Sequence, residues 1–258
     1  MKRNTLDTSK FNGTLDLPFQ LRMDDFRSAA QDVYDFFYDV NTGLTAKGLE
    51  RLDDMLRPAI MSGVLSDMLT ASLAKHSRAL AVNAYFNGHP DLVVKGEYPG
   101  NAVKAGAKGV EIKTTRKAGG AVDTHGARDQ WMCVFVYEVD TATEPARDRR
   151  PMSFTEIYLG PVTVEDFRRN ARGDLGTRTA TLHALGIAKL RHRWIYRARG
   201  LRVKHVFDTQ RGQLWNGVAR QRKITCVALN ADARIAHRMC GSQRRTGTRK
   251  RIQHDALP

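Results

Sequence analysis

The sequence predicts an α/β protein in which a central mixed β-sheet is flanked by helices. Apolar residues recur at helical spacing over residues 1–82, and short apolar or alternating segments follow over residues 83–164. A strongly basic region covers residues 165–258. Helices followed by strands and then by more helix are typical of a sheet with both faces covered. We expect these three regions, a helical region, an α/β core and a basic region, to pack together as one domain.

Three helices are expected before the sheet. Apolar side chains recur every three or four positions over residues 26–40, which is the pattern of an amphipathic helix. Asp24 and Asp25 stand where an N-cap and a first-turn acid belong. Two further helices are expected, one from residue 45 that Pro58 ends or kinks, and one over residues 62–82.

The strands of the expected sheet follow. Residues 110–114 alternate between apolar and polar side chains, so Glu111 and Lys113 share one face of a strand. Residues 131–139 are almost continuously apolar, as in a strand that is buried on both faces. The other expected strands cover residues 92–94 and 154–162, and Thr163 is expected to cap a short helix. In the basic region a helix is expected over residues 179–190, with strands over residues 201–205 and 224–229.

The composition is that of a soluble globular protein, with 41% hydrophobic and 27% charged residues. No stretch approaches the roughly 20 apolar residues that cross a bilayer, and no apolar run follows the N-terminus. The three cysteines are too few and too scattered for a disulfide framework or a zinc site, and Cys133 is expected to be a small buried side chain. We therefore expect a cytoplasmic protein without a membrane partner.

The net charge of +15 is distributed unevenly. Residues 1–164 hold 20 lysines and arginines against 21 acidic residues, whereas residues 165–258 hold 22 against 6. Arginine accounts for 18 of those 22 cations, and its planar fork suits phosphate oxygens and guanine edges. This asymmetry indicates a surface for a polyanion, although a solvated basic surface without a partner is the alternative.

Two carboxylates and a lysine stand out chemically. Asp91 begins one expected strand, and Glu111 and Lys113 lie on the next. Phosphodiester hydrolysis requires a cation that neutralises charge, an activated water and a geometry that holds both. Asp91, Glu111 and the carbonyl of Ile112 are oxygen ligands of the kind that Mg²⁺ prefers. Lys113 would then lie beside the attacking water and the phosphate. Asp91 in a turn and a solvated Glu111–Lys113 strand face are the alternative.

The pattern Pro90-Asp91, a spacer and Glu111-Ile112-Lys113 resembles the signature of the PD-(D/E)XK nucleases, which include type II restriction endonucleases. The resemblance covers about residues 65–140. It implies a restriction-endonuclease-like core in which Asp91 and Glu111 ligate Mg²⁺, or Mn²⁺ as a substitute, and Lys113 assists the nucleophilic water. Some family members add an acid from a preceding helix, for which the candidates are Glu50, Asp54 and Asp67, with Glu97 as a further loop candidate.

The resemblance leads to a Mg²⁺-dependent endonuclease of double-stranded DNA, of the sequence-specific restriction type, acting as a homodimer. A palindromic site would call for such a two-fold dimer. Two other hypotheses remain open at this point. One is a repair, recombination or junction-resolving nuclease with the same core, and the other is a basic DNA-binding protein without catalysis.

Residues after the lysine are candidate DNA contacts. The glycine-rich segment 114–130 would lie beside the metal, and His125 is a proton carrier or a structural histidine. Arg178 and Thr179 are candidates for base reading, unless Thr179 caps a helix. Trp194 and Tyr196 are expected in the core. The full set of expected contacts is Thr115, Arg116, Lys117, His125, Arg128, Gln130, Arg178, Thr179, Lys189, Arg191, Arg193, Arg202 and Lys204.

Overall fold

The computed structural model describes residues 2–117, 122–169 and 179–198. The described residues all belong to one compact unit of the chain. The strands expected over residues 201–205 and 224–229 lie outside the described residues, as do Arg178, Arg202 and Lys204. Within the described residues, no helix combines the length and apolar character that a membrane crossing requires.

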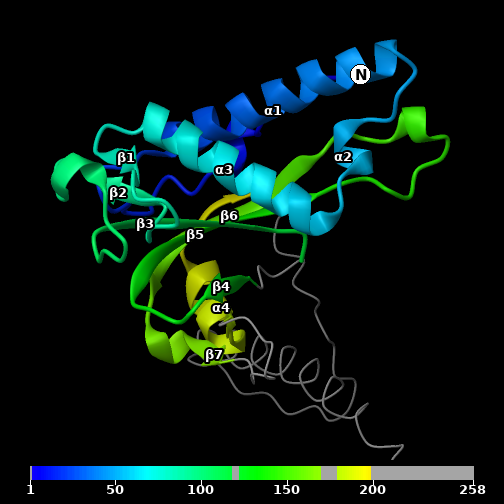
Figure 1. Ribbon diagram of the computed structural model, residues 1–258. Helices are drawn as coiled ribbons and strands as arrows, with labels where there is room; N and C mark the ends of the chain where they lie inside the picture. Colours follow the sequence, from blue (N-terminus) through cyan, green and yellow to red (C-terminus); the bar gives the residue numbers. More distant parts are fainter. Residues whose placement is uncertain (1, 118–121, 170–178, 199–258) are drawn as a thin grey trace, which may run out of the picture. The chain divides into compact units, whose positions relative to one another are not determined.

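A mixed six-stranded sheet is the centre of this unit, in the order β1-β2-β3-β5-β6-β9 (Figure 1). β3 and β5 are parallel, and every other neighbouring pair is antiparallel. The expected α/β class with a mixed sheet is therefore confirmed. The strands are β1 (Leu80–Val82), β2 (Leu92–Val94), β3 (Gly109–Thr115), β5 (Gln130–Glu138), β6 (Ser153–Val162) and β9 (Trp194–Arg197).

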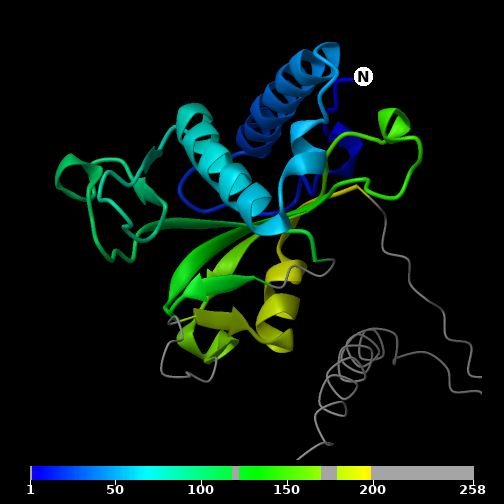
Figure 2. The same ribbon diagram turned by 45° about the vertical axis from the view of Figure 1, so that its right-hand side comes forward.

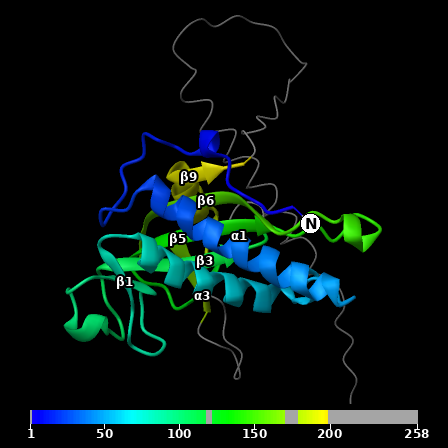
Figure 3. The ribbon, with the colours of Figure 1, turned by 90° about the horizontal axis from the view of Figure 1, so that it is seen from above.

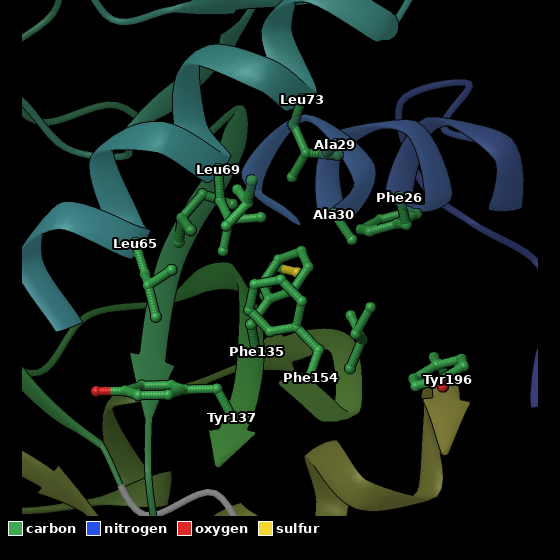
Figure 4. Close-up of a cluster of buried hydrophobic side chains, with 14 of the residues drawn as sticks. Phe26, Ala29, Ala30, Leu65, Leu69, Leu73, Phe135, Tyr137, Phe154 and Tyr196 are labelled. Carbon is green, nitrogen blue, oxygen red and sulfur yellow. The ribbon is translucent and has the colours of Figure 1, made fainter. Parts of the chain in front are cut away.

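One face of the sheet is covered by two long helices, α1 (Met23–Ala46) and α3 (Pro58–His76), which lie side by side across it (Figures 1 and 3). Their apolar stripes meet the aromatic side chains of β5 and β6. Figure 4 shows Phe26 of α1 and Leu65 and Leu69 of α3 directed toward Phe135 and Phe154, all of them buried. Burial of these apolar side chains is the main stabilising contribution to the fold.

The other face carries a smaller layer, visible below the main sheet in Figure 2. It consists of α4 (Ala184–His192) and a three-stranded sheet in the order β4-β8-β7. Its strands are β4 (Asp123–His125), β8 (Thr179–Leu182) and β7 (Phe167–Arg169). A second apolar cluster fills the space, with Met132, Val134 and Val136 of β5 packed against Leu182 and Leu190. Helices therefore flank both faces of the central sheet.

Two expected helix ends are wrong. Pro58 does not end a helix but occupies the first turn of α3, where a residue without an N–H breaks no helical hydrogen bond. The expected helix before it shrinks to α2 (Leu52–Met55). Likewise, α3 ends at His76 rather than at residue 82, because Leu80–Val82 pairs with β2 as the edge strand β1.

Two caps also differ from expectation. The N-cap of α1 is Arg22, so Asp24 and Asp25 both lie in the first turn, and the Asp25 carboxylate accepts a hydrogen bond from the Arg22 backbone. The segment expected to be helical from Thr179 begins instead with β8, so the alternative in which Thr179 caps a helix is wrong. His183 is the N-cap of α4, and its Nδ1 accepts from the Gly186 N–H at 3.0 Å.

Several expectations are confirmed. Cys133 is fully buried and Tyr196 lies in the core, while Trp194 is partly buried against the second cluster. Thr163 caps a short helical turn through a capping box with Asp166. That turn is one of four 3₁₀ segments in the described residues, namely η1 (Thr8–Lys10), η2 (Pro99–Asn101), η3 (Ala146–Asp148) and η4 (Val164–Asp166).

A polar clamp joins α1 to α3 at the surface. Asp32 Oδ2 accepts hydrogen bonds from Ser72 Oγ at 2.5 Å and from Lys75 Nζ at 3.0 Å. The ring nitrogen Nε2 of His76 lies 2.9 Å from the same oxygen and forms a third hydrogen bond. Burial by itself would raise the pKa of Asp32, but the three hydrogen bonds outweigh it and hold the pKa at about 2. The negative charge of Asp32 is therefore stabilised by the three neighbouring hydrogen-bond donors.

Candidate active site

The strand register brings Asp91 and Glu111 together. Leu92 of β2 pairs with Val110 of β3, so Asp91, one residue before Leu92, stands opposite Glu111, one residue after Val110. Opposing residues of an antiparallel pair have Cβ atoms about 4.5–5.5 Å apart on the same face. The two carboxylates that the sequence places twenty residues apart are therefore neighbours.

Asp91 is fastened to the backbone of β3. Its Oδ2 accepts a hydrogen bond of 2.7 Å from the N–H of Ile112, in the position where the next residue of a longer β2 would pair. In a strand the N–H and C=O of one residue point toward the same neighbour. The Ile112 carbonyl therefore faces the same side as the Asp91 carboxylate.

Glu111 lies at the floor of the site with no exposed surface. Lys113 shares its strand face, and its Nζ lies 2.8 Å from Glu111 Oε1 in an ion pair. His89 approaches from the other side, with its Nδ1 3.3 Å from Glu111 Oε2. The side chains of Lys113 and His89 remain about one-fifth exposed, at 21% and 19%. They connect the buried carboxylate to the surface.

The two acids respond differently to this arrangement. Burial and the negative charge of Glu111 raise the pKa of Asp91, although Lys113 and the Ile112 N–H act in the opposite direction. Burial alone would raise the pKa of Glu111, but the hydrogen bond from His89 and the charge of Lys113 lower it. The two carboxylates thus share the ammonium of Lys113, and Asp91 is the acid of the pair whose pKa is raised.

The residues present fit a hard divalent cation. The excess of negative charge at the Asp91–Glu111 pair is what a cation would neutralise, and the Ile112 carbonyl adds a third oxygen. Mg²⁺ needs only one or two carboxylates because it keeps several waters. Across the described residues, no group of three or more His, Cys, Asp or Glu side chains is placed to hold a metal ion by itself. The backbone and water ligands are therefore essential to this assignment.

Of the four further acids considered from the sequence, only Asp67 lies near Asp91. Both residues line a hollow of about 300 Å³ between α3 and the β1–β2 connection, which gives Asp91 access to solvent. Glu97 forms an exposed ion pair with Lys108 at 2.8 Å. Asp54 is paired with Arg51 and Arg149, and Glu50 is exposed at the surface before α2.

The expected DNA contacts after Lys113 differ in accessibility. Arg116 and Lys117 are exposed just beyond β3, and Arg116 Nη2 donates to the carbonyl of Val139 at 3.3 Å. Thr115 is buried on the same strand face as Lys113, and Arg128 is half-buried in the connection before β5. His125 lies on β4, where its backbone pairs with that of Thr179 on β8. Arg116 and Lys117 are therefore exposed cations of this group, whereas the Arg128 side chain is half-buried.

The basic residues of α4 and the turn after it are largely engaged within the chain. Lys189 forms an ion pair with Asp166 at 2.8 Å, and Arg191 lies 3.8 Å from Glu156. Arg193 donates to the carbonyls of Leu159 and Asp16 at 3.2 and 2.8 Å. Arg191 and Arg193 thus contact β6 of the main sheet, whereas Lys189 contacts η4. Much of the basic excess lies elsewhere, because residues 199–258, outside the described part, contain 14 lysines and arginines and three acidic residues.

The sequence did not predict the contact of His89 or the burial of Gln130 at this face of the sheet. His89 stands two positions before Asp91, and that proximity was the available signal for its contact with Glu111. Gln130 was expected to be a DNA contact that orients a phosphate or reads adenine, and it is buried at the beginning of β5 with 6% of its surface exposed. The sequence gives no signal for this burial, because Gln130 is a single polar residue at the end of an apolar segment.

Comparison of the chain with protein-family models, with curated proteins and with solved structures finds no match. The functional argument therefore depends on the chemistry of the residues described above.

Proposed function

We propose that this protein is a Mg²⁺-dependent endonuclease that hydrolyses phosphodiester bonds of double-stranded DNA. The observation that supports the proposal is the meeting of Asp91 and Glu111 at the β2–β3 junction, with the Lys113 ammonium 2.8 Å from Glu111. The order of elements, a helix, a short strand with the aspartate, a strand with Glu-Ile-Lys and a buried parallel strand, supports a restriction-endonuclease-like core.

In this proposal Asp91, Glu111 and the Ile112 carbonyl would hold the metal. When bound, Mg²⁺ supplies charge neutralisation at the phosphate and lowers the pKa of a coordinated water. Lys113 would position the nucleophile and the scissile phosphate through its ammonium, which forms an ion pair with Glu111. His89 fixes the second oxygen of Glu111, so that the carboxylate keeps one orientation.

The hypothesis of a restriction-type enzyme requires that the protein bind a DNA duplex. The exposed cations Arg116 and Lys117 lie directly beyond the site strand, where they would contact phosphates and orient the duplex. Cleavage of both strands at a palindromic site would require a homodimer with one site per strand. These finer features are expectations of the same proposal.

Plasmid cleavage tests the proposal. The wild-type protein is expected to convert supercoiled plasmid to linear or discrete fragments with Mg²⁺ or Mn²⁺, and not with EDTA. Glu111→Gln should abolish cleavage. Glu97→Gln is the matched control, because it alters an acid in an exposed ion pair of the same length.

The products distinguish the competing functions. Fragment ends at one repeated sequence support a restriction enzyme, whereas nicks at branched structures without a sequence preference support a repair or junction-resolving nuclease. Intact DNA under every divalent metal, with DNA affinity unchanged by Lys113→Ala, would leave only a non-catalytic DNA-binding protein.

A further inference from the structure

Phe86 is a large aromatic side chain that lies almost entirely in solvent. It belongs to the connection between β1 and β2, and 86% of its surface is exposed, more than for any other large apolar side chain of the described residues. Exposed apolar side chains that are scattered singly need no explanation. Phe86 does need one, because the turn that carries it is anchored next to the candidate active site.

The turn around Phe86 has a fixed shape. The Gly88 N–H donates to the Tyr85 carbonyl at 2.9 Å and closes a four-residue turn. Phe86 and Asn87 are its two central residues, and Asn87 has a φ of +54°, a conformation that asparagine adopts more readily than most residues. A side chain at position 88 would clash with the Val103 carbonyl, so glycine is required there. The turn is therefore packed against the segment that follows η2.

Asn83 fastens this turn to the residue that begins the site. Its backbone N–H donates to the Asp91 carbonyl at 2.9 Å. Its buried side chain donates to the carbonyls of Pro90 and Val103 at 3.0 and 2.8 Å. The same carboxamide accepts from the N–H groups of Tyr85 and Val103 at 3.1 and 3.0 Å. All the hydrogen-bonding positions of one carboxamide thus hold the connection in place relative to Asp91.

The turn also borders the opening at Asp91. The hollow of about 300 Å³ through which Asp91 reaches solvent is lined by Tyr85 and Asn87, the two neighbours of Phe86 in the sequence. A phosphate that approaches a metal at Asp91 through this hollow would pass beside the turn. The base pairs next to that phosphate would then come within reach of the exposed ring.

The chain beside the turn carries a cation. Lys104 is exposed, and its backbone carbonyl accepts a hydrogen bond of 3.1 Å from the N–H of His89, which contacts Glu111. Lys104 therefore lies beside both the turn and the candidate active site. An exposed aromatic ring next to a cation is typical of surfaces that stack on bases and bind the phosphate backbone. This combination favours a nucleic acid over an apolar protein surface as the partner of Phe86.

We infer that Phe86 inserts between two base pairs next to the scissile phosphate of a DNA duplex and unstacks them. This inference rests on the proposed nuclease function. An apolar side chain that enters a base step bends the duplex, at the cost of the lost base stacking. The anchored turn reduces the total cost, because Phe86 is held in position before DNA binds. The bend brings the phosphate into the hollow at Asp91.

Three variants of the full chain test the inference. Phe86→Ser removes the ring, and Phe86→Trp retains an aromatic side chain. Leu49→Ser is the matched control, because Leu49 is a 54% exposed apolar side chain between α1 and α2. The probes are duplexes with the sequence that the wild-type protein cleaves, bound in Ca²⁺ in place of Mg²⁺. Each carries 2-aminopurine at one position around the cut, and the fluorescence of this base rises when it loses its stacking.

Wild type and Leu49→Ser should raise the fluorescence at one base step beside the cut. Phe86→Ser should give no rise and bind the duplex about 10-fold more weakly, as for the loss of one aromatic stacking contact. Phe86→Trp should bind within a few-fold of wild type. Without DNA, Phe86→Ser should melt at the wild-type temperature, because the exposed ring buries little apolar surface in the free protein.

Three results would overturn the inference while leaving the proposed function intact. One is binding by Phe86→Ser with wild-type affinity. Another is the absence of a fluorescence rise with wild type at any position, since the duplex would then remain stacked. The third is a change in the oligomeric state of Phe86→Ser without DNA, measured by sedimentation equilibrium, which would assign the ring to a contact between two copies of the chain. Absence of cleavage by the wild-type protein under every metal would instead refute the proposed function and this inference with it.

Discussion

Asp32 and Asp91 are two aspartates in opposite electrostatic situations. Asp32 lies between α1 and α3, where three donors from Ser72, Lys75 and His76 surround one carboxylate and its pKa falls to about 2. Asp91 is largely buried and faces a second carboxylate, that of Glu111. Burial and this negative charge raise the pKa of Asp91, although Lys113 acts in the opposite direction.

This difference separates an acid that stabilises the fold from an acid pair whose repulsion, under the proposed function, a divalent cation would relieve. A carboxylate with matched donors stabilises the native state at neutral pH, because the fold favours its charged form. A pair with too little positive charge destabilises the metal-free protein and gains from a divalent cation. Perturbed ionisation of this second kind is typical of functional sites.

The largest expected effect concerns Lys113. Lys113→Ala should reduce Mg²⁺-dependent cleavage by about 100- to 10,000-fold, because the ammonium beside the reacting phosphate and water is lost. Lys108→Ala, which breaks the exposed ion pair with Glu97, should cleave within a few-fold of wild type. Time courses of plasmid cleavage measure both. Equal losses in the two variants would contradict a specific role for Lys113.

The second prediction is that removal of the Asp91 charge increases the stability of the protein, whereas removal of a charge from an ion pair usually decreases it. Asp91→Asn should raise the free energy of unfolding in EDTA by about 1 kcal/mol, because it removes a repelled charge while keeping an oxygen that can accept from Ile112. Because the folded pKa of Asp91 is raised, the contribution of Asp91 to stability is greatest in acid and falls as pH rises through that pKa. The gain should therefore be present at pH 8 and absent near pH 3, as measured by urea unfolding.

Cleavage by Asp91→Asn should be lost although the protein is more stable. A variant that is both less stable in EDTA and inactive would indicate that Asp91 is a structural residue like Asp32. That outcome would remove the contrast between the two acids.

The third prediction tests the balanced acid. Asp32→Asn should lower the free energy of unfolding by about 1 kcal/mol at pH 7, a value kept small because the clamp is partly exposed to solvent. Because the folded pKa is below the ordinary value, this contribution is complete above about pH 4 and disappears as pH falls toward 2. Wild type and variant should therefore converge in stability in acid. Cleavage at pH 7 should not change.

The smallest effects concern single basic residues. Lys117→Ala should reduce the slope of log affinity against log salt by about 1 and weaken DNA binding similarly for all sequences, as for a phosphate contact. Arg193→Ala should leave that slope unchanged and lower stability by about 1 kcal/mol, because its guanidinium is bound to two carbonyls of the chain. Equal slopes in Lys117→Ala and wild type would show that Lys117 does not contact phosphate.

The central strands and the acidic pair were predictable because the signals are local. Alternation over residues 110–114 and continuous apolar residues over 131–139 define β3 and β5, and the register follows once those strands align. By contrast, Pro58 begins a helix instead of ending one, and Leu80–Val82 leaves the helix to pair with β2. Both outcomes depend on tertiary pairing, which a local pattern does not contain.

Burial of polar side chains was the least predictable part of the site. Gln130 owes its burial to the strands on either side of β5, and His89 owes its contact to Glu111, twenty-two positions later. The basic residues illustrate the same point, because the composition favours phosphate contacts, yet Lys189 and Arg193 bind partners within the chain.

Binding of Mn²⁺ to the full chain with duplex DNA, followed by the electron paramagnetic resonance signal of the free ion, tests the central claim most directly. The carboxylates of Asp91 and Glu111 are expected to share one cation. Wild type and Glu97→Gln should therefore bind Mn²⁺ with equal affinity, whereas Asp91→Asn and Glu111→Gln should each bind at least about 10-fold more weakly. Equal Mn²⁺ affinity in all four proteins would contradict the shared cation site.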